Sequence, residues 1–162
     1  MKTILLFVVL ALLAGCEYEV PLSQKPSSKA NPALAGRWIE QKDSNSTNRI
    51  EIEIKVSGND YDVAYVENSC TNFLFSGFEV KAAGFKLVQL TWQNPDKENP
   101  KTRYVFMKYE LTPEGFFFRQ INTAVVSAKC RTTEELLGDL KLHRKNPSLF
   151  KDPRKFVRSA SQ

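Results

Sequence analysis

The stretch Arg49-Ile50-Glu51-Ile52-Glu53-Ile54-Lys55-Val56 decides the fold class, because apolar and charged residues alternate in it without a break. Successive side chains of a β-strand point to opposite faces, so this period of two predicts a strand with one buried face and one face in water. A polar turn, Ser57-Gly58-Asn59-Asp60, separates it from residues 61–66, which are rich in aromatic and β-branched residues. Together the two stretches predict a β-hairpin.

The chain downstream repeats this arrangement of short apolar runs and tight turns. Further strands are predicted at residues 77–82, 85–93, 103–111, 116–121 and 124–128. Strands that follow one another through tight turns predict an antiparallel meander, and closure into a barrel removes the exposed edges. We therefore expect a mainly β domain at residues 34–130: an antiparallel meander that closes into a small barrel, with a C-terminal helix packed against it.

The amino terminus has the pattern of an export signal. Lys2 provides a positive start, and an apolar run follows from Ile4 to Ala14. This run is much shorter than the ~20 apolar residues that a membrane-spanning helix needs. We predict that residues 1–15 are a signal peptide that is removed.

The run ends in Leu13-Ala14-Gly15-Cys16, which resembles the lipobox of bacterial lipoproteins. The resemblance implies that Cys16 carries a diacylglycerol, and two or more acyl chains make a stable membrane anchor. Glu17 stands where aspartate is linked to inner-membrane retention in enteric bacteria, which favours the outer membrane. The alternative is an ordinary secretory signal followed by a cysteine by chance. Residues 16–33 are polar and contain prolines, so we expect a flexible tether after the lipidated cysteine.

Cys70 and Cys130 are the two cysteines that remain besides Cys16. In an oxidising compartment such a pair is expected to form a disulfide, worth about 4 kcal/mol for a loop of this size. A metal site is not expected, since the chain has a single histidine, and no CxxC redox motif is present.

Residues 131–158 are predicted to form a basic, helical C-terminal segment. Thr132 and Glu135 form a capping box, and Leu136, Leu137 and Leu140 give an apolar stripe at helical spacing. Asn146-Pro147 ends this helix, and a second short turn or helix is predicted at residues 153–158.

The whole positive net charge of +5 lies between Lys129 and Arg158, where nine lysines and arginines stand against four acids. One interpretation is a charged face that is merely solvated. The other is contact with anionic lipid headgroups or lipopolysaccharide, through Lys141, Arg144, Lys145, Lys151, Arg154, Lys155 and Arg158.

Gly36-Arg37-Trp38, at the entrance to the domain, is similar to the Gly-x-Trp motif of lipocalins and lipocalin-like domains. The resemblance covers about residues 34–145. It implies that Trp38 plugs the closed end of an up-and-down barrel, with an arginine from a late strand, Arg119 or Arg103, packed over it. Other small antiparallel barrels or sandwiches remain the alternative.

Phe116-Phe117-Phe118 is the most unusual local feature, because in a strand Phe117 points opposite to its two neighbours. Either the C-terminal helix covers the exposed face, or that face is an apolar pocket or interface. The candidate ligand-binding or partner-binding residues are Trp38, Phe116, Phe117, Phe118 and Arg119.

The sequence shows no catalytic constellation. His143 stands between basic residues of the predicted helix, no Gly-x-Ser-x-Gly elbow is present, and Glu51 and Glu53 fall on the outward face of a strand. We expect a non-enzymatic envelope lipoprotein without cofactor, which binds an apolar molecule or an envelope protein and no nucleic acid. The alternatives are a structural or assembly accessory without a small-molecule ligand and, third, a hydrolase of unrecognised type.

Overall fold

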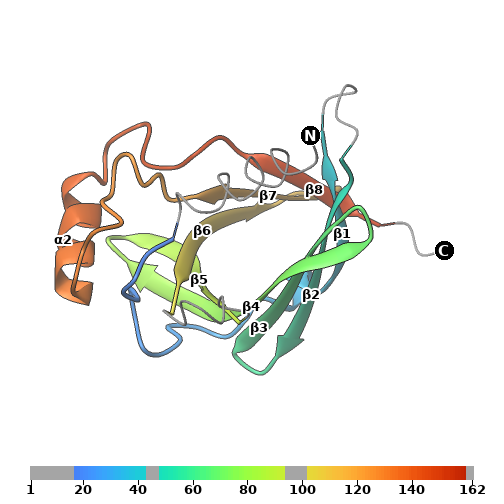
Figure 1. Ribbon diagram of the computed structural model, residues 1–162, viewed down its shortest axis with the longest axis horizontal. Coiled ribbons are helices and arrows are strands. Elements are labelled where there is room, and N and C mark those ends of the chain that lie inside the picture. The colour runs from blue at the N-terminus through green and yellow to red at the C-terminus, as the bar shows by residue number, and fades with distance from the viewer. Residues whose placement is uncertain (1–16, 43–47, 94–101, 160–162) are drawn as a thin grey trace, which may run out of the picture.

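The computed structural model describes residues 17–42, 48–93 and 102–159, with the side chains of residues 70–72 left out. These residues form a closed barrel of eight antiparallel strands in chain order (Figure 1). This confirms the predicted meander barrel. The strands are β1 Gly36–Gln41, β2 Ile50–Ser57, β3 Asp60–Glu67, β4 Cys70–Ala82, β5 Phe85–Trp92, β6 Tyr104–Leu111, β7 Gly115–Gln120 and β8 Arg154–Arg158, accompanied by the 3-10 helix η1 Pro32–Leu34 and the helix α2 Thr133–Leu142.

β8 closes the barrel, because it pairs with both β1 and β7. The prediction of a turn or helix at residues 153–158 is therefore wrong, and the C-terminal segment is only partly helical. Phe156 is fully buried between strands that would otherwise be open edges. β8 is stabilised by pairing with the edges of β1 and β7. Because these strands are distant in the chain, the local sequence of residues 153–158 does not indicate a strand.

The strand predicted at residues 124–128 is also absent, and turns take its place. The Asn122 side chain accepts a hydrogen bond from Ala124 N–H at 3.0 Å, and the Asn122 carbonyl accepts one from Val125 N–H at 2.9 Å. Both bonds bend the chain and exclude an extended conformation. β4, by contrast, begins at Cys70 and is much longer than the predicted strand at residues 77–82.

The helix α2 starts as its capping box predicts. The Thr132 side chain accepts a hydrogen bond from Glu135 N–H at 3.1 Å. The Glu135 carboxylate accepts one from Arg131 N–H at 2.7 Å, one residue before the usual donor, the N–H of the N-cap residue. Leu136 and Leu140 are fully buried in an apolar cluster that covers the outer face of β4–β6.

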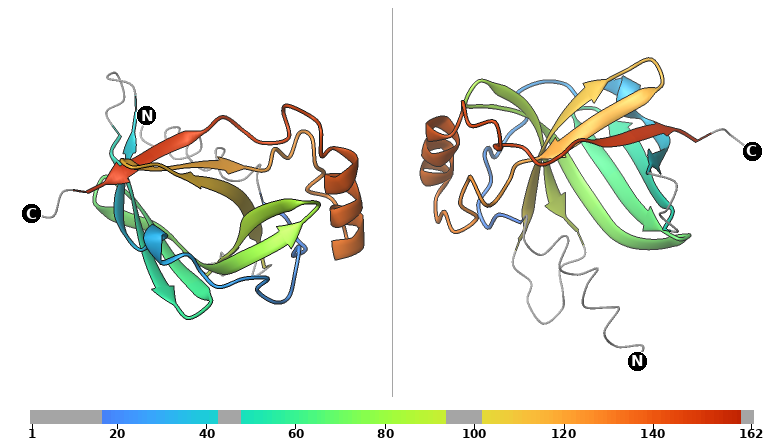
Figure 2. Two further views of the ribbon diagram at one scale, coloured as in Figure 1. Left: turned by 180° about the vertical axis from the view of Figure 1, so that it is seen from behind. Right: turned by 90° about the horizontal axis from the view of Figure 1, so that it is seen from above.

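The N-terminal strap, residues 17–35, runs around the outside of the barrel to the start of β1 (Figure 2). Tyr18 and Leu22 are buried in the cluster under α2, and Ala30 is buried against the barrel core. The prediction of a flexible tether up to residue 33 is therefore wrong for the described part. None of the described helices is long and apolar enough to cross a membrane.

The structure does not bring Cys70 and Cys130 together. Cys130 is a free cysteine packed against the apolar cluster under α2. The predicted bridge is therefore not formed in this structure. Cys16 lies outside the described residues.

Candidate functional site

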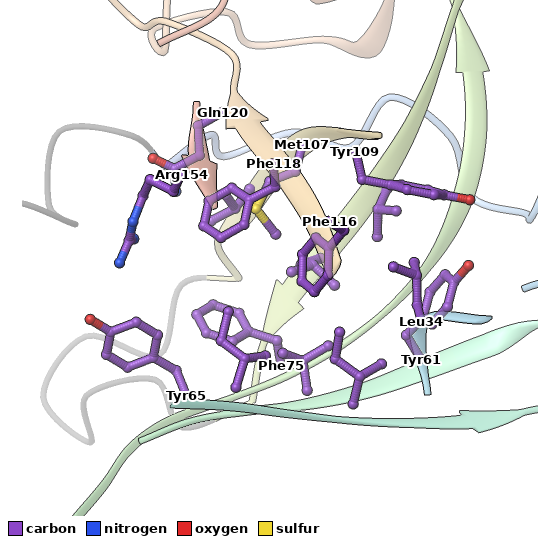
Figure 3. Close-up of a pocket in the computed structure, with 16 residues that line it drawn as sticks. Leu34, Tyr61, Tyr65, Phe75, Met107, Tyr109, Phe116, Phe118, Gln120 and Arg154 are labelled. Carbon is purple, nitrogen blue, oxygen red and sulfur yellow. The ribbon is translucent and has the colours of Figure 1, made fainter. Parts of the chain in front are cut away.

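The barrel encloses an apolar cavity of about 100 Å³. Its wall is formed by inward-facing side chains of seven strands, β2 to β8, because alternate residues of each strand share the inner face. Figure 3 shows Leu34, Tyr61 and Tyr109 at one end of this cavity and Tyr65, Gln120 and Arg154 at the other. The lining residues include Ile52, Ile54, Val63, Phe75, Val88, Leu90, Val105, Met107, Phe116 and Phe118.

A second, wider cavity of about 830 Å³ lies at the end marked by Arg154. We call it the mouth. Tyr65, Phe118, Gln120 and Arg154 line both cavities, so the inner apolar space and the mouth are adjacent. The mouth as a whole is mostly polar, with four bases and three acids: Lys42, Arg119, Lys151, Arg154, Glu40, Glu67 and Asp152.

Arg154 stands where the two cavities meet. Its Nε donates a 2.5 Å hydrogen bond to Glu40, whose side chain is only 6% exposed. The guanidinium also lies 5.2 Å from the ring centre of Phe118 and 5.7 Å from that of Phe156. An arginine from the last strand is thus fixed by a carboxylate of the first strand and by two aromatic faces.

The charges at this junction stabilise one another. Burial alone raises the pKa of Glu40, but Arg154 and Lys42 outweigh it and hold that pKa below its usual value. Burial alone lowers the pKa of Arg154, while the hydrogen bond and charge of Glu40 raise it. Burial raises the pKa of the Tyr65 phenol, which keeps it protonated beside Arg154. The mouth therefore contains a fixed ion pair and neutral hydroxyl groups at neutral pH.

Two buried polar atoms of the described side chains have no hydrogen-bond partner: Glu40 Oε2 and Trp92 Nε1. Glu40 Oε2 has the Lys42 ammonium 3.4 Å away, a charge contact without hydrogen-bond geometry. Trp92 ends β5 at the same end of the barrel as the mouth, and its ring lies 5.7 Å from that of Phe73. Buried groups of this kind are rare and are a reason to expect a ligand or ordered water nearby.

The opposite end of the barrel is closed. Trp38 is 2% exposed and its Nε1 donates to the Leu34 carbonyl at 2.8 Å, which draws η1 over this end. The Arg158 guanidinium lies 4.5 Å from the centre of the Trp38 ring. The expected arginine over Trp38 is therefore Arg158, not Arg119 or Arg103. Arg119 is exposed on the outer face of β7, and the described contacts of Arg103 are with Glu17 and Glu19.

Beside the closed end, a fully buried carboxylate holds the N-terminal strap. Glu79 accepts hydrogen bonds from Tyr61 at 2.9 Å, from Tyr109 at 2.8 Å and from Ser28 at 2.7 Å. Its fourth partner is the Lys86 ammonium at 2.7 Å. Burial alone raises the pKa of Glu79, but these four donors outweigh it and lower the pKa below its usual value.

The structure divides the predicted ligand-binding residues between three places. Phe116 and Phe118 point into the barrel and line the cavity, whereas Trp38 plugs the closed end. Phe117 lies half-buried on the outer face, with the Lys155 ammonium 5.9 Å from its ring centre. In the described part of the chain, the cluster under α2 does not include Phe117. Arg119 lies on the rim of the mouth.

The predicted basic face is divided as well. Arg154 faces the interior and Arg158 lies over Trp38. Lys141, Arg144 and Lys145 are exposed at the end of α2 and just after it, and Lys151 borders the mouth. These seven residues therefore do not form a single surface.

Sequence reasoning missed Glu40, Tyr65 and Arg154 as parts of the site. Tyr65 was available from the alternation of β3, where Tyr61, Val63 and Tyr65 share one face. Glu40 and Arg154 carried no such signal, because charged residues are normally assigned to the outer face of a strand. Their mutual neutralisation across the β1–β8 closure is visible only in three dimensions.

The described residues contain no group of three or more histidine, cysteine, aspartate or glutamate residues that could hold a metal ion. His143 pairs with Asp139 at 3.4 Å, one helical turn away. No protein-family model, curated protein or solved structure matches this chain.

Proposed function

We propose that this protein is a lipid-anchored envelope lipoprotein, in the outer membrane, whose lipocalin-like barrel binds an amphipathic small molecule without catalysing a reaction. The observation that carries the proposal is that the inner apolar cavity adjoins the polar mouth and shares four lining residues with it. An apolar end of the ligand fits the inner cavity, and its polar end fits the mouth beside Arg154.

The sizes of the two cavities limit the ligand. Pockets for small molecules usually measure about 300–1,000 Å³, a range that includes the mouth but not the inner cavity. The ligand therefore lies mainly in the mouth and extends only a slender apolar end past Phe118. The Arg154–Glu40 pair presents both a donor and an acceptor to the polar end.

The test uses the fluorescent probe 1-anilinonaphthalene-8-sulfonate, which combines an apolar ring system with an anionic group. We expect saturable binding to the wild-type protein and displacement by n-alkanoates. Val63→Phe, which fills the inner cavity, should weaken probe binding at least several-fold.

Phe117→Ser is the matched control, because Phe117 lies on the outer face of the strand that carries the cavity residues Phe116 and Phe118. It should leave probe binding unchanged. Equal losses in Val63→Phe and Phe117→Ser would contradict the interior site. A folded wild-type protein that binds no probe would instead favour a structural accessory role.

A further inference from the structure

We infer that the lipid on Cys16 holds the barrel with its mouth toward the bilayer, so that the ligand site opens onto the membrane surface. This inference rests on the proposed function, from which it takes the anchor and the mouth. It adds a fixed orientation and a source for the amphipathic ligand, namely the lipid surface that carries the anchor.

The N-terminal strap begins at the mouth end of the barrel. Tyr18 and Tyr104 exchange two backbone hydrogen bonds of 2.9 Å each. Met107 of β6 is paired with the mouth residue Gln120. Tyr104, the first residue of β6, lies three residues before Met107, on the side of the mouth. The strap is therefore attached beyond the level at which the cavity opens.

The attachment is tight. Tyr18 is 1% exposed, its ring lies 4.9 Å from that of Phe106, and its hydroxyl donates to the Val126 carbonyl at 3.2 Å. Arg103 contacts the carboxylates of Glu17 and Glu19 at 3.8 Å and 3.2 Å. These contacts fix the chain on both sides of Tyr18.

The chain between this attachment and the anchor is short. Cys16 is two residues before Tyr18, so covalent geometry keeps their Cα atoms within about 7 Å of each other. Diacylation places the Cys16 side chain at the membrane surface. Tyr104, at the mouth end of β6, must then lie within about 12 Å of the Cys16 Cα atom, and so close to the lipid headgroups.

The exposed bases after α2 lie beside the mouth. The Arg144 guanidinium lies over the β4–β5 turn, where a Cβ at Gly84 would be 3.2 Å from it. The ring of Phe85, at the end of the same turn, lies 5.3 Å from that of Phe150, which lines the mouth together with Pro147 and Ser148. A mouth that faces the bilayer therefore brings these bases toward the same lipid surface, where anionic headgroups attract them.

The two tryptophans report directly on the orientation. Trp92 ends β5 at the mouth end, and Trp38 is buried at the closed end. The lipidated full-length product, purified from membranes, is reconstituted in phosphatidylcholine–phosphatidylglycerol vesicles that contain a lipid with a nitroxide on its headgroup. We expect the nitroxide lipid to quench the wild-type fluorescence clearly and the fluorescence of Trp92→Phe only weakly. Equal quenching of the two proteins would overturn the inference.

A tryptophan at the other end tests the opposite orientation. Asn59→Trp, in the exposed β2–β3 turn at the closed end, should remain unquenched in the Trp92→Phe background, and strong quenching would show that the closed end faces the membrane and overturn the inference. Insertion of ten Gly and Ser residues between Cys16 and Glu17 should abolish the quenching of Trp92, because such a linker reaches roughly 18 Å. The same ten residues appended after Gln162 should change nothing. The insertion pair uses the native tryptophans and stays informative if Trp92→Phe does not fold.

Two independent measurements separate this inference from the proposed function. Flotation of the protein with the vesicles tests the anchor, and titration with 1-anilinonaphthalene-8-sulfonate tests the ligand site. Loss of flotation or of probe binding contradicts the proposed function. Flotation and probe binding without selective quenching of Trp92 contradict only the orientation.

Discussion

The Arg158 guanidinium lies 4.5 Å from the centre of the Trp38 ring, and its two terminal nitrogens donate to the Ala35 and Ala33 carbonyls at 3.3 Å each. Trp38 and Arg158 are also register partners in the β1–β8 pair. One side chain of the last strand thus fixes the plug of the closed end and the chain that leads into the first strand. This contact joins the two ends of the meander.

Arg158→Ala should lower the free energy of unfolding by about 1–3 kcal/mol, because it removes the cation–π contact and two hydrogen bonds. Arg158→Lys should recover only part of the loss, since an ammonium cannot stack as a planar group or reach both carbonyls. Urea denaturation measures the difference. Arg37→Ala is the control, because this side chain is 64% exposed and makes a weak ion pair with Glu53 at 3.9 Å. A loss of unfolding free energy of similar size in Arg37→Ala would contradict the specific role of Arg158.

Glu79 should make the stability of the barrel depend on acid. Its folded pKa is lowered, so its contribution is fully present above its unfolded pKa of about 4.5 and is lost as the pH falls through the lower folded value. We expect the urea midpoint of the wild-type protein to fall over this range. Glu79→Gln should be less stable at pH 7, by on the order of 2 kcal/mol, and less sensitive to acid.

Glu53→Gln provides the comparison for Glu79, because Glu53 lies on the outer face of β2 and is 40% exposed. Its replacement should leave both the midpoint and its pH dependence nearly unchanged. Indistinguishable pH profiles for the wild-type protein and Glu79→Gln would show that Glu79 is not the titrating group. Glu40, whose pKa is also lowered, would then be the next candidate.

The sequence predicted the parts of the fold whose signals are local. Alternation places Ile50, Ile52 and Ile54 inside the barrel, and the capping box locates the start of α2 at Thr132. β8 was missed because its inward-facing residues are Arg154, Phe156 and Arg158. Two of these three are charged, whereas the inward-facing residues of an ordinary strand are apolar. The main partners of these two arginines include Glu40 and Trp38 on the first strand, which lie more than a hundred residues away.

The strap was missed for a related reason. Tyr18, Val20 and Leu22 recur at every second position, but this pattern covers only six residues of a polar, proline-containing segment. What orders the segment is the set of partners that other strands provide, including Gln89 and Glu79. Of the candidate site, the sequence supplied Phe116 and Phe118 but not the ion pair beside them, since neither charge has a local signature.

Gln89 should control how firmly the strap is held. Its buried amide accepts hydrogen bonds from Leu22 N–H at 2.8 Å and Ser23 N–H at 3.1 Å, and donates to the Ser23 carbonyl at 2.9 Å. Gln89→Leu removes all three bonds at similar volume. We expect faster amide hydrogen exchange at residues 18–25, with exchange in β2 and β3 unchanged. Unchanged exchange in the strap would mean that its apolar contacts alone hold it.

The same variant bears on membrane orientation only indirectly. Tyr18 retains its bonds to Tyr104 when Gln89 is replaced, so the quenching of Trp92 by headgroup-labelled lipid should persist. Tyr18→Ala removes the ring contact with Phe106 and should reduce that quenching. The opposite ranking of the two variants would contradict the attachment at Tyr18.

The Cys130 thiol should be free and slow to react. Burial, followed by the nearby charges of Asp139 and Glu135, raises the pKa of this thiol above its usual value, so the thiol stays protonated at neutral pH. Thiolate is the reactive form, and we therefore expect iodoacetamide to modify Cys130 more slowly in the native protein at pH 7 than in urea, with the native rate rising steeply above pH 9. Mass mapping without reductant should recover the Cys130 peptide alkylated. Recovery of that peptide linked to the Cys70 peptide would instead restore the disulfide.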